Sequence, residues 1–240
     1  MASYAASIRS VPWTPSQGLL LFVLPWIILP VGLIINVSIA ANFIPSLRGF
    51  MNALGSGDPA AAFALVLVDA VGSMALIWYF LRKYKVGLSS LGVRSFSIGK
   101  ALWYLVLLFV SFGVLITAAD ILVKLIYPGF NPAEPQTNEF ISSPSSLSLW
   151  ALVLIPPIIE EAVFRGFLFP AFAKRYGVVI GAMISSLLFA VAHLQLNVSI
   201  YTFILGLLLC FLYVRLGSII PGIGIHMLNN YLAYMALNQQ

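Results

Sequence analysis

Long apolar runs separated by short polar segments divide this chain into candidate membrane-spanning helices. The runs lie at about 18–43, 59–81, 101–127, 148–172, 177–198, 199–215 and 219–237. The hydrocarbon core of a bilayer is about 30 Å thick, and a helix needs about 20 apolar residues to cross it. The pattern therefore predicts seven spans, or eight if the polar segment 128–147 contains a further helix.

The composition strengthens this interpretation. Hydrophobic residues make up 61% of the 240 residues and charged residues only 8%, which lies far outside the range of soluble domains. A chain of this length accommodates one bundle of helices and no separate soluble domain. We therefore expect an all-α polytopic transmembrane bundle that forms a single domain, 1–240, whose first apolar run is too long for a signal-peptide core and is retained.

The basic residues lie between the apolar runs, mostly on one predicted side of the membrane. That side carries Arg9, Arg82, Lys83, Lys85, Arg94, Lys100, Lys174, Arg175 and Arg215. The loops on the other side contain Arg48, Glu134 and Glu139. By the positive-inside rule the N-terminus is expected in the cytoplasm and the C-terminus outside. Because these charges form no patch, the net charge of +5 indicates contact with a lipid bilayer and argues against a nucleic-acid partner.

Three charged residues interrupt the fourth run: Glu160, Glu161 and Arg165. An ionised side chain at the centre of a spanning helix costs about 2.5–3.5 kcal/mol, so these residues need partners, water or a ligand. Glu161 and Arg165 are four residues apart and can pair on one helix face, whereas Glu160 points about 100° away and stays available. Pro156 and Pro157 predict a kink or break that places both glutamates on the first turn after it, where a helix N-terminus favours negative charge.

The only two histidines of the chain fall in later predicted spans. His193 lies one helical turn after Phe189, and His226 shares a helix face with Asn230, while Asn229 is turned aside. Each group alone could be an ordinary contact between helices. Together with Glu160 they predict three helices whose polar faces meet in one pocket. On the predicted boundaries His193 falls near the outer end of its span, so this convergence requires tilted spans or boundaries displaced by a turn or more.

Three motifs in this order resemble those of a known family. Glu160 to Arg165 is similar to EExxxR, Phe189 to His193 to FxxxH, and His226 to Asn230 to HxxxN of the CPBP intramembrane proteases, also called Abi or type II CAAX prenyl endopeptidases. The resemblance covers residues 150–231. It implies an intramembrane endopeptidase in which Glu160 and His193 position and deprotonate a water, His226 and Asn230 donate to the oxyanion, and Glu161 and Arg165 hold the site in shape, with Phe189 beside them.

Metal use is a separate question, since family members are often labelled metalloproteases. Zinc or another divalent ion could be held by Glu160, His193, His226 and Asn230 with an open position for water. Asparagine is a poor zinc ligand, and the chain lacks an HExxH helix. We therefore expect a glutamate mechanism that requires no cofactor.

Two other functions compete with proteolysis: an ion- or proton-coupled transporter, and a non-catalytic immunity or scaffold protein. A transporter predicts matched halves, whereas the chemistry here is confined to the C-terminal half. No functional role is assigned to Asp58, Asp69, Asp120 and Lys124, which are expected to pair near the membrane edge, Asp120 with Lys124 at helical spacing. The expected substrate is a membrane protein or peptide, prenylated or bacteriocin-like, and the expected location is a prokaryotic plasma membrane.

Overall fold

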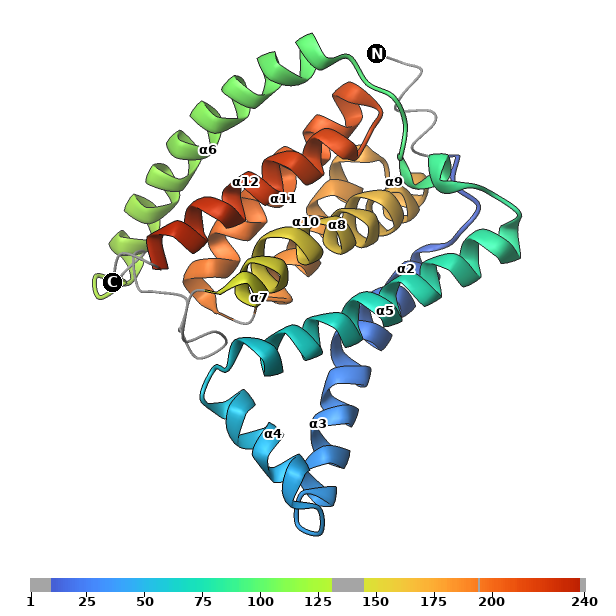
Figure 1. Ribbon diagram of the computed structural model, residues 1–240. Coiled ribbons are helices and arrows are strands. Elements are labelled where there is room, and N and C mark those ends of the chain that lie inside the picture. The colour runs from blue at the N-terminus through green and yellow to red at the C-terminus, as the bar shows by residue number, and fades with distance from the viewer. Residues whose placement is uncertain (1–9, 131–144, 194, 238–240) are drawn as a thin grey trace.

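The described part of the chain in a computed structural model comprises residues 10–130, 145–193 and 195–237. Within these ranges every regular element is helical (Figure 1), so the predicted all-α class is confirmed. Five helical segments are long and apolar enough to cross a membrane: Pro15–Ala40, Pro59–Tyr84, Ile98–Ile126, Ser146–Tyr176 and Asn197–Leu216. The protein is therefore an integral membrane protein by the character of its helices.

The described helices fall into two halves of the chain. The first half contains α2 (Pro15–Val23), α3 (Leu29–Ala40), α4 (Pro45–Gly55), α5 (Pro59–Tyr84) and α6 (Ile98–Ile126). The second half contains α7 (Ser146–Leu149), α8 (Ile155–Glu160), α9 (Phe169–Tyr176), α10 (Val178–Val191), α11 (Leu196–Leu216) and α12 (Ile220–Leu237). π-Helical turns at Leu24–Ile28, Trp150–Leu154 and Glu161–Leu168 join neighbouring helices, so that α7, α8 and α9 form one continuous rod.

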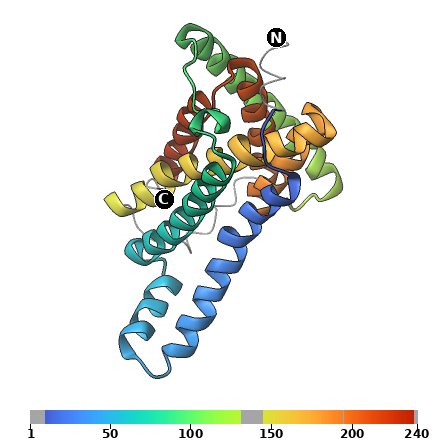
Figure 2. The same cartoon turned by 90° about the vertical axis from the view of Figure 1, so that its right-hand side faces the viewer.

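Two features differ from the expected boundaries. The predicted loop 44–58 contains α4, which projects with α3 away from the other helices in both Figure 1 and Figure 2. The predicted span 177–198 is occupied by α10, whose 14 residues rise about 21 Å and so fall short of a bilayer core. The polypeptide turns at residues 192 and 193, and α11 begins at Leu196. The count of seven spans stays a prediction.

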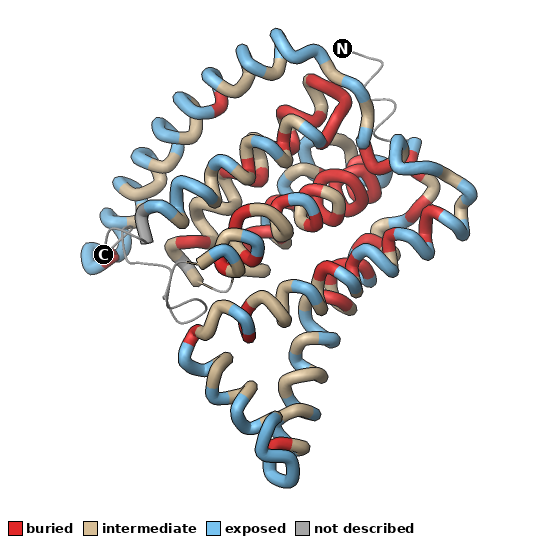
Figure 3. Tube along the Cα trace, viewed as in Figure 1, coloured by how far each residue is buried: buried red, intermediate tan, exposed pale blue. Residues whose placement is uncertain are grey.

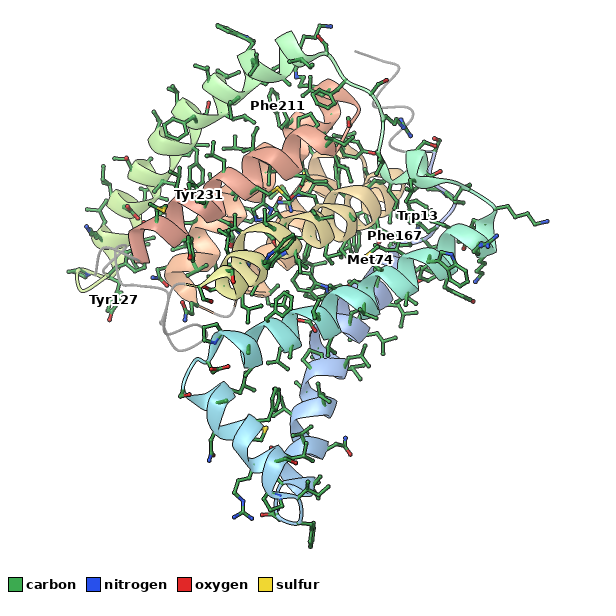
Figure 4. All side chains as sticks on the ribbon, viewed as in Figure 1. Trp13, Met74, Tyr127, Phe167, Phe211 and Tyr231 are labelled. Atoms are coloured by element: carbon green, nitrogen blue, oxygen red, sulfur yellow. The ribbon has the colours of Figure 1, made fainter. Side chains whose placement is uncertain are left out.

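The core of the bundle surrounds the π-helical turn Glu161–Leu168. Val163, Phe164, Phe167 and Leu168 are completely buried there, and burial in Figure 3 is densest along this rod. Trp13, from the segment before α2, stacks on Phe167 with 4.2 Å between ring centroids and donates from Nε1 to the Phe167 carbonyl at 3.0 Å. Figure 4 shows the two rings together. The first residues of the described chain thus pack against the second half of the protein.

Helix α6 lies at the outside of the bundle (Figure 1) and has one buried residue, Leu108, which packs against Leu212 and Leu216 of α11. Tyr201 of α11 donates to the Asp120 carboxylate at 3.4 Å. Among the described residues Asp120 and Lys124 form no ion pair, so the pairing expected from their spacing is wrong. The mostly exposed, apolar surface of α6 is that of a helix facing lipid.

The loops expected on the cytoplasmic side lie together. Ser218 Oγ donates to the Arg94 carbonyl at 2.7 Å, and the Ile219 amide donates to the Gly92 carbonyl at 3.0 Å. Gly92 has φ +85°, and a Cβ there would lie 2.6 Å from the Tyr213 ring, so only glycine fits. Two of the expected basic loops therefore contact each other. Arg9, Glu134 and Glu139 lie outside the described residues, and the orientation of the chain stays a prediction.

Candidate active site

The helix that carries the glutamates is not broken at its two prolines. Pro156 and Pro157 occupy the first turn of α8, directly after the π-helical turn Trp150–Leu154, and the Ile155 amide donates to the Trp150 carbonyl five residues earlier. A π-helical turn accommodates an extra residue without ending the helix. Of the expected kink or break, the break is therefore wrong, and the kink stays a prediction: Glu160 lies within a continuous rod, and no helix N-terminus stabilises its charge.

Asn230 of α12 compensates for the donors that the prolines lack. The Leu152 carbonyl would accept from residue 156 in an α-helix or from residue 157 in a π-helix, and neither proline has an N–H. Asn230 Nδ2 donates to this carbonyl at 2.9 Å. Asn229 Nδ2 donates to Asn230 Oδ1 at 3.3 Å, so Asn229 contacts the site and is not turned aside as expected. Both contacts fix the orientation of the Asn230 carboxamide.

Glu161 and Arg165 form the ion pair that their spacing predicted. Arg165 Nη1 lies 2.9 Å from Glu161 Oε1, and both side chains are 1% exposed. The Arg165 guanidinium also lies over the Phe189 ring, 4.3 Å from its centroid, which is a favourable cation–π geometry. Phe189 thereby supports the pair, and the positive charge of Arg165 balances one of the two glutamates.

His226 connects the two glutamates, an arrangement that the sequence did not reveal. Its Nδ1 lies 3.1 Å from Glu161 Oε1 and its Nε2 lies 3.3 Å from Glu160 Oε2. The contact with Glu160 lacks hydrogen-bond alignment, and Glu160 Oε2 is buried with no hydrogen-bond partner among the residues described. An imidazole between two carboxylates is suited to donate from both nitrogens. Because the contact between His226 Nε2 and Glu160 Oε2 is not aligned as a hydrogen bond, Glu160 keeps this oxygen able to accept from water.

His193 lies in the turn after α10 and not inside a span. Its Nδ1 is 2.8 Å from the Phe189 carbonyl, and because a carbonyl only accepts, this nitrogen is the donor. A neutral His193 then presents Nε2 as an acceptor. Helix α10 ends at Val191, more than a turn before the expected end of the span at residue 198. His193 can therefore line the same cavity as Glu160 and His226.

A cavity of about 450 Å³ brings the four expected catalytic residues together. Glu160, His193, His226 and Asn230 all line it, from three separate parts of the second half. Its wall also includes polar residues to which the sequence analysis gave no part: Asp69, Gln195, Thr202, Asn229 and Tyr234. Asp69 carried a usable signal, because it is an acidic residue in the middle of an apolar run, as Glu160 is. The catalytic roles themselves stay predictions.

Whether this site can hold a metal depends on which side-chain atoms still offer a lone pair. Among the described residues no three His, Cys, Asp or Glu side chains are grouped to hold a metal ion. Both nitrogens of His226 face carboxylates, and His193 Nδ1 faces a carbonyl. A coordinating imidazole nitrogen must offer its lone pair to the metal, which His193 Nε2 can do while Nδ1 donates to the carbonyl, so the absence of a metal stays a prediction.

Comparisons with known proteins agree with the motifs. Residues 142–232 match the family model described as type II CAAX prenyl endopeptidase Rce1-like. A relative described as an uncharacterized 24.3 kDa protein of Escherichia coli is 32% identical over 105 residues, which are 40% of this chain and 48% of that protein. The chain thus spans about half the length of this relative. No solved structure matches significantly. Residues 142–232, with their three motifs, are therefore similar to the Rce1-like type II CAAX prenyl endopeptidases.

Proposed function

We propose that the protein is an intramembrane endopeptidase that hydrolyses a peptide bond of a membrane-associated protein or peptide. The supporting observation is the cavity lined by Glu160, His193, His226 and Asn230 in a bundle of apolar helices. Such a cavity can hold water beside a carboxylate, which hydrolysis within a membrane requires. The family match and the motif order agree with this chemistry.

In the proposed reaction Glu160 acts as the general base and His193 helps to position the water. Glu160 accepts a proton from the water, and the water oxygen forms a bond to the scissile carbonyl carbon while the carbonyl π electrons move to its oxygen. The resulting tetrahedral intermediate then breaks its C–N bond. Glu160 returns the proton to the departing nitrogen, so that one acid and one amine are formed.

His226 and Asn230 are the proposed donors to the oxyanion. Asn230 Nδ2 carries two hydrogens, of which one is directed to the Leu152 carbonyl, leaving the second available. His226 Nε2 lies at the cavity beside Glu160, and Glu161 orients its ring through Nδ1. Donors held in place before the reaction stabilise the developing charge most effectively. The Glu161–Arg165 pair is thus a positioning device.

This mechanism requires no metal. Purified protein treated with a strong chelator should retain its cleavage activity, measured on a substrate found in cells, with metal content determined on the same sample. A loss of activity that only zinc restores would overturn this part of the proposal.

We further propose a prenylated, CAAX-type or bacteriocin-like substrate and a prokaryotic plasma membrane, with the N-terminus inside. The test compares peptides released from cells that produce the wild type, Glu160→Ala or the control Asp120→Asn. We expect protein termini that appear with the wild type and Asp120→Asn and disappear with Glu160→Ala. Identical peptides from all three strains would contradict the proteolytic role. Full cellular function of Glu160→Gln would instead support a non-catalytic partner, and solute flux without cleavage in proteoliposomes would support a transporter.

A further inference from the structure

Asp69 is a carboxylate in the cavity wall that the proposed reaction does not use. It lies near the middle of α5, the second membrane-spanning helix, and lines the cavity together with Glu160. Its Oδ1 is buried and has no hydrogen-bond partner within the described part of the chain. An ionisable group at membrane depth without a partner is expensive and is by default a candidate functional group.

The apolar part of the cavity lining offers Asp69 no free donor. It includes Trp26, Val66, Ala70 and Ile155, and the indole N–H of Trp26 is already engaged. Trp26 Nε1 donates to Ser73 Oγ at 3.1 Å, one helical turn beyond Asp69. This indole N–H is therefore not available to Asp69, whose Oδ1 remains without a partner among the described residues.

The cavity lining carries more acidic than basic side chains. Its described lining contains the carboxylates of Asp69 and Glu160 and no lysine or arginine. The buried Arg165 is paired with Glu161, and His226 lies between the two glutamates. A further positive charge must come from outside the wall if Asp69 is to be paired when ionised.

We propose that Asp69 is a specificity-determining residue that binds the lysine or arginine side chain of a substrate peptide. This inference rests on the proposed function, because it places the substrate in the same cavity. A carboxylate paired with a cation after both are removed from water gives a strong preference over an uncharged side chain of the same length. The cavity then selects peptides that carry a basic residue near the bond to be cut.

The test measures binding without turnover, in purified Glu160→Gln protein reconstituted in neutral phosphatidylcholine vesicles. The probes are dansyl-labelled apolar peptides of one span, with a single lysine moved through four central positions, and the same peptides with norleucine. For at least one position we expect the lysine peptide to bind about tenfold more tightly than its norleucine partner. Equal binding at all four positions would overturn the inference.

A second set of proteins assigns the preference to Asp69. Adding Asp69→Asn to Glu160→Gln should abolish the difference between lysine and norleucine peptides, whereas adding Asp120→Asn, the same change on lipid-facing α6, should preserve it. A lysine preference that survives Asp69→Asn would also overturn the inference. Binding is measured in a variant that need not cleave. The binding test therefore decides the role of Asp69, and the separate peptide-release test decides whether the wild type is a protease.

Discussion

At the scale of single residues, His226 gives the adjacent carboxylates of Glu160 and Glu161 different hydrogen-bond partners. It binds Glu161 at 3.1 Å, where Arg165 already neutralises the charge, and approaches Glu160 without forming an aligned hydrogen bond. The helical spacing in the sequence predicted the Glu161–Arg165 pair, because both residues lie on one element. It did not predict the link from His226 to both glutamates, because the relative height of two helices depends on packing and leaves no trace in the spacing of motifs.

The Asn230 carboxamide should affect both turnover and folding, because it also donates to the Leu152 carbonyl, and leaving that acceptor unsatisfied costs about 1–3 kcal/mol. Asn230→Ala removes one proposed oxyanion donor, which is worth about 3 kcal/mol in barrier height, so kcat for an identified substrate should fall about 100-fold. Asn229→Ala removes the neighbouring amide but no oxyanion donor, and should lower kcat by less than about tenfold. If Asn230→Ala cleaved at nearly the wild-type rate, its role as a donor would be wrong.

The buried ion pair should affect stability. Arg165→Met leaves Glu161 buried without its guanidinium, and loss of one partner of a buried pair destabilises a protein by about 3–5 kcal/mol. Thermal unfolding in detergent should therefore show a much lower midpoint. Arg48→Met changes an exposed arginine that donates to the Ala41 carbonyl at 3.3 Å, and this control should change the midpoint little. Equal shifts for both variants would show that the pair contributes no stability.

At the scale of elements, hydropathy predicted where helices exist but not where one of them ends. Residues 190–200 contain no proline or glycine to mark a helix end, although polar residues alternate with apolar ones from His193 on, and α10 stops at Val191. Side chains make this end possible: His193 Nδ1 bonds the Phe189 carbonyl at 2.8 Å, and Ser199 Oγ bonds the Ala190 carbonyl at 2.9 Å. The first bond satisfies a carbonyl that helix termination leaves free, and the second adds to the His193 backbone amide, which also donates to the Ala190 carbonyl. Such an end depends on contacts across the turn, so it could not be located from the apolar pattern.

The close packing of α9 and α10 gives a stability prediction for this part of the fold. A Cβ at Gly181 would lie 2.5 Å from the Ala173 amide nitrogen, so Gly181→Ala must push the two helices apart. The expected cost is about 1–3 kcal/mol in the free energy of unfolding. Gly113→Ala in α6 meets nothing within 4 Å and should leave that free energy unchanged or raise it by up to about 1 kcal/mol. Chemical denaturation in mixed micelles can compare them, and an unaffected Gly181→Ala protein would refute the prediction.

At the scale of the whole molecule, the family match covers only residues 142–232, but the first half completes the structure around them. Helix α5 contributes Asp69 to the cavity, and Lys174 Nζ bonds the Val11 carbonyl at 2.8 Å near the start of the described chain. The sequence predicted one membrane domain, and the structure shows both halves in contact. The partners of the N-terminal half could not be predicted, since its apolar runs carry no motif that specifies a neighbour.

The N-terminal contact can be tested with two tryptophans. Trp13 is 0% exposed and stacks on Phe167, so Trp13→Ala should destabilise the protein by about 3–5 kcal/mol. Trp103 is 68% exposed on α6, and Trp103→Ala should cost less than about 1 kcal/mol. Unfolding midpoints of both variants in the same detergent give the comparison. Similar small losses would mean that the segment before α2 is not part of the stable core.

The π-helical turns on either side of α8 make chain length as important as side-chain identity in this rod. Every residue of an α-helix advances the direction of its side chain by about 100°. Loss or gain of one residue between Leu152 and Glu160 would rotate one end of the rod relative to the other. Either Glu160 or the Leu152 carbonyl, which Asn230 binds, would then point away from the cavity. Homologues of this protein should therefore show substitutions along this stretch but neither insertions nor deletions.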